Sequence, residues 1–220
     1  MIEDDKRIAA EAAVAEVRDG MLVGLGTGST AAFAITAIGR LGLGIEAVAT
    51  SVATERLAIA HGIRVRAFDQ VATVDLTIDG ADEIDCHLRA IKGAGGAMLR
   101  EKVVAAASRR MVVIADGSKR VAAIGAAKLP VEVLPFAQSF VSAALAEMGG
   151  DPVPRGGFVT DNGNVIIDCR FNAVGPEALA AALAAIPGVL GHGLFLHEVD
   201  AAYVADRGVV TRLERHRSSR

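Results

Sequence analysis

Acidic residues and a lysine gather around glycines in the middle of the sequence. The apolar run 74–78 leads into Asp79-Gly80-Ala81-Asp82-Glu83, and Lys92 precedes the turn Gly93-Ala94-Gly95-Gly96. Glu101 lies about one turn inside the helix expected next. A hydrophobic core has no use for so many charged groups, whereas chemistry in an open α/β sheet gathers where strands end and loops begin. These residues therefore form a candidate active site.

The residue types at this site favour proton transfer. Crowded carboxylates raise one another's pKa, which suits Asp79 and Asp82 to acid–base chemistry. Lys92, beside small residues, can approach a substrate oxygen and stabilise developing negative charge. Glu101 is the candidate general base. A metal-binding cluster is the competing function for the aspartates, and a solvated acidic turn with a surface lysine is the structural alternative.

A second glycine-rich segment has the features of a phosphate site. Gly26-Thr27-Gly28-Ser29-Thr30 follows an expected strand and opens a helix, so its amide groups and three hydroxyls favour an anion. Gly26-x-Gly28-x-x-Ala31 also matches the dinucleotide fingerprint, but Thr50 and Ser51 stand where the ribose-binding acid belongs. A sugar phosphate is therefore favoured, with a tight βα turn as the structural alternative. Lys119, after another expected strand, is a further candidate contact to phosphate or sugar hydroxyls.

The order of the expected elements indicates an α/β fold. Helices are expected at 4–18 and 51–61, and strands at 45–50 and 111–115, with further elements alternating between them. Such alternation is typical of a Rossmann-like, largely parallel sheet with helices on both faces.

A different pattern begins near Leu129. The elements expected from there follow the order β-α-β-β-α-β, which fits a ferredoxin-like α+β module. Within it, Asp161-Asn162-Gly163-Asn164 separates the β-type runs 158–160 and 165–167, and Asn-Gly in such a place predicts a hairpin.

The last expected strands, 201–205 and 209–213, would return to the first part of the chain. The sequence therefore predicts a Rossmann-like catalytic domain made of residues 1–128 and 201–220. Residues 129–200 would form a ferredoxin-like domain inserted into it.

Composition narrows the class of partner. The formal net charge of −3 offers no positive field for nucleic acid or an anionic membrane. Cys86 and Cys169 lie far apart and are expected to be reduced thiols, and the histidines show no metal-site spacing. The N-terminal residues do not form a secretory signal, and no apolar run is long enough to span a bilayer. We therefore expect a cytoplasmic protein with a small-molecule substrate.

Taken together, the motifs resemble those of ribose-5-phosphate isomerase of the A type. They occur in the same order from near residue 6 to about residue 199, and it is the combination that is specific. The matching segments are Gly24-Leu25-Gly26-Thr27-Gly28-Ser29-Thr30, Asp79-Gly80-Ala81-Asp82-Glu83, Ile91-Lys92-Gly93-Ala94-Gly95, Leu99-Arg100-Glu101-Lys102, Ala115-Asp116-Gly117-Ser118-Lys119, Leu129-Pro130-Val131-Glu132-Val133 and Val159-Thr160-Asp161-Asn162-Gly163-Asn164.

The resemblance implies interconversion of ribose 5-phosphate and ribulose 5-phosphate through an enediolate, without metal or cofactor, in the non-oxidative pentose phosphate pathway. Glu101 would be the base that moves the proton between C1 and C2. Asp79, Asp82 and Lys92 would assist ring opening and stabilise the enediolate oxygens, and Lys6 would be a further phosphate contact. The family is usually a homo-oligomer, with a dimer expected first and a tetramer as the alternative. The residues expected to line the substrate are Thr27, Gly28, Ser29, Thr30, Asp79, Gly80, Ala81, Asp82, Lys92, Gly93, Ala94, Gly95 and Lys119.

One position departs from the family pattern. The usual triple glycine after the lysine is Gly93-Ala94-Gly95 here. A positive φ at Ala94 would cost roughly 1 kcal/mol, and the added methyl group could shift the affinity for the sugar.

Two other functions compete with the isomerase. One is another enzyme on a related scaffold, such as a sugar-phosphate deaminase, a lactonase or a CoA transferase. The other is a non-catalytic sugar-phosphate sensor, although no segment is left over for a DNA-binding helix-turn-helix. Retention of Asp79, Asp82, Lys92 and Glu101 together argues against the sensor.

Overall fold

The computed structural model describes residues 1–171 and 175–215, and its largest element is a seven-stranded sheet. The strand order is β14-β13-β7-β4-β1-β2-β3, and all neighbours are parallel except β13 and β14. The expected Rossmann-like, largely parallel sheet is therefore confirmed. The strands are β1 (Leu22–Leu25), β2 (Glu46–Ala49), β3 (Arg64–Val65), β4 (Leu76–Gly80), β7 (Met111–Asp116), β13 (Ala201–Asp206) and β14 (Val209–Glu214).

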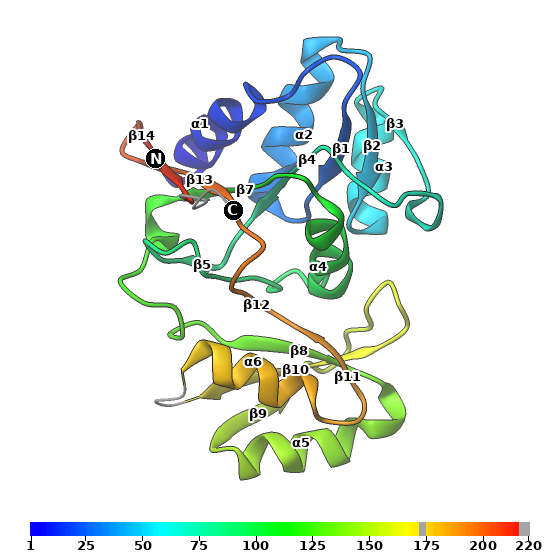
Figure 1. Ribbon diagram of the computed structural model, residues 1–220, viewed down its shortest axis with the longest axis vertical. Coiled ribbons are helices and arrows are strands. Elements are labelled where there is room, and N and C mark those ends of the chain that lie inside the picture. Colours follow the sequence, from blue (N-terminus) through cyan, green and yellow to red (C-terminus); the bar gives the residue numbers. More distant parts are fainter. Residues whose placement is uncertain (172–174, 216–220) are drawn as a thin grey trace, which may run out of the picture.

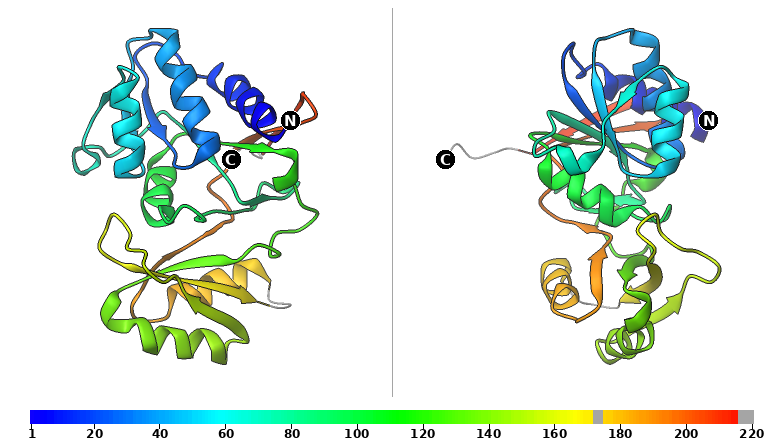
Figure 2. Two further views of the ribbon diagram at one scale, coloured as in Figure 1. Left: turned by 180° about the vertical axis from the view of Figure 1, so that it is seen from behind. Right: turned by 90° about the vertical axis from the view of Figure 1, so that its right-hand side faces the viewer.

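Helices cover both faces of this sheet (Figures 1 and 2). Alternate residues of a strand point to opposite faces, so Ile114 of β7 packs in the core beneath the first two helices, whereas Val113 packs with Ala105 on the other side. None of the described helices is both long and apolar enough to cross a membrane. The helices of this half are α1 (Ile2–Val14), α2 (Ser29–Leu41), α3 (Val52–Ala60) and α4 (Met98–Ala107), with 3-10 turns η1 (Phe68–Gln70) and η2 (Gly117–Lys119).

A four-stranded antiparallel sheet forms a second lobe (Figure 1). Its order, β11-β8-β10-β9, combined with the helices between its strands, is that of the expected ferredoxin-like module. Val141 and Leu145 of one helix and Leu183 of the other pack on this sheet. The elements are β8 (Leu129–Val133), η3 (Pro135–Ala137), α5 (Gln138–Glu147), β9 (Gly150–Pro154), β10 (Val165–Phe171), α6 (Pro176–Ala184) and β11 (Val189–His192).

The hairpin expected from the Asn-Gly signal is only partly correct. The strand that precedes β10 in the sequence and pairs with it is β9, at Gly150–Pro154, and the run 158–160 is not a strand. A turn nevertheless forms where it was expected, because Thr160 N donates to Asn164 O (2.9 Å) and Gly163 adopts φ +80°. The residues before this turn form a long loop that leaves the small sheet and reaches the other lobe.

A small third sheet connects the two lobes. It has the order β12-β6-β5 and consists of β5 (Glu83–Ile84), β6 (Ala90–Ile91) and β12 (Leu194–Phe195). After β12 the chain enters β13, which pairs with β7, so the predicted return of the last strands to the first sheet is confirmed. The predicted division at residues 129 and 200 stays a prediction, and residues 216–220 lie outside the described part of the chain.

Candidate active site

Lys92 lies at the centre of a buried charge cluster at the carboxyl end of β4. Its ammonium group lies 2.9 Å from Asp79 Oδ2 and 3.0 Å from Glu101 Oε2. It also donates a hydrogen bond of 2.6 Å to the carbonyl oxygen of Gly80. All three charged side chains are buried, with 2% of Lys92, 0% of Asp79 and 3% of Glu101 exposed. The lysine therefore bridges two carboxylates that come from different elements of the fold.

Asp79 is held rigidly at the end of β4. Its Oδ1 accepts hydrogen bonds from the amide groups of Gly80 (2.7 Å) and Thr27 (3.2 Å). Gly26 allows this close approach, since a Cβ there would lie 2.0 Å from Asp79 Oδ1. The aspartate therefore connects the end of β4 to the loop that follows β1.

The burial of the cluster shifts its proton affinities. Burial raises the pKa of Glu101 to about 7, with the charge of Asp79 adding to the effect and Lys92 opposing it. Burial also raises the pKa of Asp79, against the opposing charge of Lys92. Burial alone would lower the pKa of Lys92, but the two carboxylates outweigh it and raise that pKa. Lys92 therefore stays cationic at neutral pH, while Glu101 can gain or lose a proton near pH 7.

The glycine-rich turn after Lys92 forms one wall of the site. The amide of Ala94 donates to Asp82 Oδ2 (2.9 Å), which connects the turn to the acidic loop. Positive φ occurs at Gly93 (+109°) and Gly96 (+80°), whereas Ala94 is not among the positive-φ residues. The departure from the triple glycine therefore introduces no left-handed residue, and the backbone cost considered for Ala94 does not arise.

The segment between β1 and α2 forms the opposite wall. Gly28 caps α2 with φ +117°, a conformation that favours glycine, and the following amide groups open the helix. Ser29 Oγ accepts a hydrogen bond of 3.1 Å from Lys6 Nζ, which comes from α1. The exposed helix N-terminus and this lysine together favour an anion.

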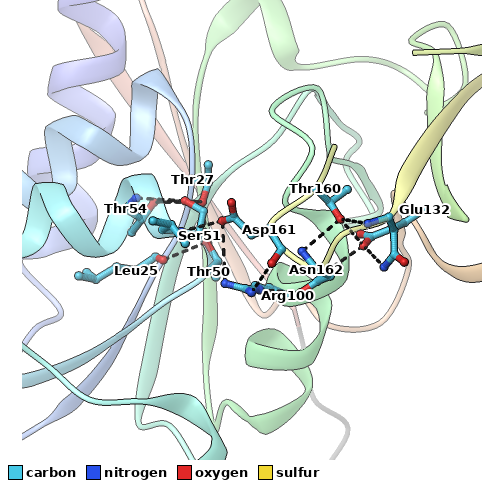
Figure 3. A network of polar contacts seen from close by, with 12 residues as sticks. Leu25, Thr27, Thr50, Ser51, Thr54, Arg100, Glu132, Thr160, Asp161 and Asn162 are labelled. Atoms are coloured by element: carbon cyan, nitrogen blue, oxygen red, sulfur yellow. Dashed lines mark hydrogen bonds and ion pairs between the residues drawn. The ribbon is translucent and has the colours of Figure 1, made fainter. Parts of the chain in front are cut away.

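Thr27 differs from the expectation that all three hydroxyls of the segment cradle a phosphate. Its Oγ1 lies 2.8 Å from Thr50 Oγ1, 2.8 Å from Ser51 Oγ and 3.0 Å from Thr54 Oγ1 (Figure 3). The Thr27 hydroxyl therefore forms hydrogen bonds with residues at and just before the start of α3. Ser29 and Thr30 carry the remaining hydroxyl groups of the segment that could contact an anion.

A cavity of about 470 Å³ joins these walls. It brings together every residue predicted for the site except Asp79, which lies beneath it. It is also lined by Ile2, Lys6, Asp116 and Ser118. Asp116 and Ser118 precede Lys119 in the loop after β7, so the strand-end signal that indicated Lys119 could have indicated them as well. The predicted residues that line the cavity are Thr27, Gly28, Ser29, Thr30, Gly80, Ala81, Asp82, Lys92, Gly93, Ala94, Gly95, Glu101 and Lys119.

Phe195 is a neighbour of the charge cluster that no sequence signal indicated. Its ring is fully buried, and its centroid lies 5.4 Å from Lys92 Nζ and 3.9 Å from Lys102 Nζ. An aromatic face stabilises a nearby cation, so the ring supports both lysines from the side of β12.

The family to which these features correspond is shown by comparison with known proteins. The family described as ribose 5-phosphate isomerase A (phosphoriboisomerase A) matches residues 46–208. A protein of Sphingopyxis alaskensis named ribose-5-phosphate isomerase A is 53% identical, over 97% of this chain and 96% of its own length. The chain belongs to the ribose 5-phosphate isomerase A family. The family match includes Asp79, Asp82, Lys92 and Glu101, and the relative's match extends over nearly the whole chain.

Solved structures of the family have the same fold. The ribose 5-phosphate isomerase A of Neisseria gonorrhoeae superimposes with a TM-score of 0.95 at 39% identity, over 99% of each chain. A D-ribose-5-phosphate isomerase in complex with phospho-erythronic acid superimposes with a TM-score of 0.94 at 36% identity, over 98% of this chain and 100% of that one. The two-lobed architecture is therefore that of the ribose 5-phosphate isomerase A family.

Proposed function

We infer that the chain interconverts D-ribose 5-phosphate and D-ribulose 5-phosphate, an aldose–ketose isomerisation. One observation carries the chemistry: Lys92 lies between two buried carboxylates, and one of these, Glu101, lines a cavity that also contains the N-terminus of α2. The related enzyme bound to phospho-erythronic acid supports this reading. That ligand is a phosphorylated four-carbon acid, and its planar carboxylate resembles an enediolate.

Proton transfer would proceed through Glu101. Its carboxylate removes the proton from C2 of the open-chain aldose, the C–H electron pair forms a C1–C2 double bond, and the carbonyl π electrons move to O1. The Lys92 ammonium group stabilises the charge of the resulting enediolate. A proton then passes from O2 to O1, and Glu101 returns its proton to C1 as the ketone forms at C2.

The two aspartates would have different tasks. Asp82 lines the cavity, which supports assigning to its carboxylate the transfer of a proton between the anomeric hydroxyl and the ring oxygen when the sugar ring opens. Asp79 lies beneath the cavity against Lys92 and the amide of Thr27, which makes it a positioning residue for the lysine.

The phosphate group would occupy the other end of the cavity. Ser29 and Thr30 at the start of α2, together with Lys6 and Lys119, supply hydroxyls, amide groups and positive charge there. Glycine and alanine in the turn after Lys92 let the sugar carbons lie close to the backbone between the two ends.

The reaction is tested by following ribulose 5-phosphate formation from ribose 5-phosphate by purified protein treated with EDTA. Turnover that survives the chelator supports the proposal. Binding of ribose 5-phosphate without turnover would replace it with the sensor function. Turnover only of an amino-sugar phosphate, a lactone or an acyl-CoA would point instead to the corresponding enzyme.

The pH dependence of kcat/KM should show an acidic limb near pH 7. Glu101 acts as a base only when ionised, so activity falls as pH decreases through its pKa of about 7. Asp79→Asn removes a negative charge that raises the Glu101 pKa, so its acidic limb should move to lower pH. The exposed Glu177→Gln variant is the control and should leave the limb in place. An unmoved limb in Asp79→Asn would show that another group titrates.

We propose a homodimer, with a tetramer as the alternative, located in the cytoplasm. Phe136 is 97% exposed and Phe140 58% exposed on the small lobe, and contact between copies would remove such apolar surface from water. Light scattering after size-exclusion chromatography measures the mass of the assembly.

A further inference from the structure

The turn at residues 160–164 is fixed from within the small lobe by a buried glutamate. Glu132 of β8 is 0% exposed, and its Oε1 accepts hydrogen bonds from Thr160 Oγ1 (2.9 Å), Asn162 Nδ2 (3.0 Å) and Asn164 Nδ2 (2.8 Å) (Figure 3). A carboxylate with several donors holds them strongly in a dry environment. The small lobe therefore supplies three of the hydrogen bonds that hold the turn in its shape.

The same turn contacts the large lobe at two helix starts. Asp161 Oδ2 accepts a hydrogen bond of 2.7 Å from the amide of Val52, the first residue of α3. Arg100, in the first turn of α4, donates from Nε to Asn162 Oδ1 (2.8 Å) and from Nη2 to the carbonyl oxygen of Asp161 (2.9 Å). Asn162 thus uses one end of its amide group on Glu132 and the other on Arg100.

The first turn of α4 has little support from its own sequence. Its N-cap is Ala97, which makes no side-chain capping hydrogen bond. Uncapped helix ends leave amide groups without partners, and substitution of a capping residue by alanine costs about 1 kcal/mol. The position of this turn therefore depends on tertiary contacts.

Those contacts are made by the residues next to Glu101 in the sequence. Leu99 packs against Gly191 of β11, where a Cβ would lie 3.0 Å from Leu99 Cδ1. Arg100 contacts the 160–164 turn, and Lys102 forms an ion pair with Glu198 (3.1 Å). Successive helix residues differ by about 100° in direction, so Glu101 points to Lys92 while its neighbours contact the small lobe and the segment that returns from it.

We propose that the 160–164 turn, acting through Asn162 and Arg100, positions the first turn of α4 so that Glu101 stays within contact of Lys92 and the substrate carbons. Arg100 and Asn162 are positioning residues in this proposal, which rests on Glu101 being the base of the proposed reaction. The small lobe thereby contributes to catalysis without itself supplying a reacting group.

The test compares Arg100→Met, Asn162→Ala and the double variant with the unaltered protein. Methionine keeps most of the apolar stem of arginine but removes both donors. A misplacement of about 1 Å in a reacting group can cost 10²-fold, so kcat of each single variant should fall roughly 10- to 100-fold. KM should change by less than about twofold, since a group needed only in the transition state affects kcat. The double variant should lose less activity than the product of the two single losses, because both changes remove the hydrogen bond between Arg100 and Asn162.

A pH profile separates positioning from a general loss of stability. The charged groups that act on Glu101 are Lys92 just after β6, Asp79 in β4, Asp82 in the loop after β4, and Lys102 on α4 itself. Weaker contact with Lys92 raises the pKa of Glu101, so the acidic limb of kcat should move to higher pH in both single variants. Arg64→Met, which removes an exposed arginine paired with Glu46, is the matched control and should change neither kcat nor the limb.

One result would overturn the proposal and leave the proposed function intact. In it, Arg100→Met and Asn162→Ala fold and show normal kcat and an unmoved acidic limb, while the unaltered protein is active and Glu101→Gln is inactive. A lower melting temperature with unchanged kcat would also overturn it, since that is the result of a purely structural contact. If Arg100→Met does not fold, Asn162→Ala supplies the same comparison without altering α4. An inactive unaltered protein would instead refute the proposed function.

Discussion

Glu101→Gln should lower kcat by roughly 10²- to 10⁴-fold, the range expected when a general base is removed. Glutamine has nearly the same shape as glutamate, so the lining of the cavity keeps its shape and ribose 5-phosphate should still bind. Lys92 keeps Asp79 as its partner at 2.9 Å, so the lysine does not become a buried unpaired charge. The measurement is kcat from initial rates, with substrate binding followed separately by calorimetry.

Glu55→Gln is the matched control for this variant. Like Glu101, Glu55 lies in the first turn of a helix, but it is exposed and belongs to α3. Its kcat should match that of the unaltered protein. Near-normal turnover in Glu101→Gln would show that another group moves the proton, and the assignment of the base would then be wrong.

Lys92→Met should damage both activity and stability. The enediolate loses the ammonium group that stabilises it, and loss of such a group costs about 10²–10³ in kcat. The variant also leaves Asp79 and Glu101 buried without their shared cation. Removing one partner of a buried ion pair costs roughly 3–5 kcal/mol of the free energy of unfolding, because the remaining charge is uncompensated.

The stability loss in Lys92→Met should depend on pH with a defined sign. The pKa values of Asp79 and Glu101 are already raised by burial, and without the lysine they rise further. The penalty is therefore largest at high pH, where both groups are charged, and decreases as pH falls and they bind protons. Urea unfolding at pH 8 and pH 5 measures it, with exposed Lys128→Met as control. An equal loss at both pH values would show that lost packing, not charge, is responsible.

Much of the fold could be predicted because local patterns coincide with the final structure. Apolar runs such as Met111–Asp116 are buried on both faces, as expected for central parallel strands. Gly42 and Gly62 mark the ends of α2 and α3. The residues of the cavity were also predictable as a set, because the carboxyl ends of β1, β4 and β7 meet at one edge of the sheet.

What the sequence could not show depends on contacts between distant residues. The Thr27 hydroxyl turns toward Thr50 and Thr54, which a local reading of its loop cannot anticipate. The contact between Arg100 and Asn162 spans 62 positions of the sequence. The Asn-Gly signal located a turn but misidentified the strand before it. The residues before the turn form a loop that contacts the other lobe, where Arg155 donates to the carbonyl oxygen of Ala94.

The position of β13 has a consequence for how the chain folds during synthesis. Residues 201–206 form the strand between β7 and β14, so the large sheet is incomplete until these residues have left the ribosome. Until then β7 is an edge strand whose backbone N–H and C=O groups lack the partners that β13 supplies in the finished sheet. Such an edge is a template for aggregation, and closing it requires a contact of long sequence separation, which is slow to form. The small lobe has all its strands by residue 192, so it can fold first and bring the last strands back to this edge.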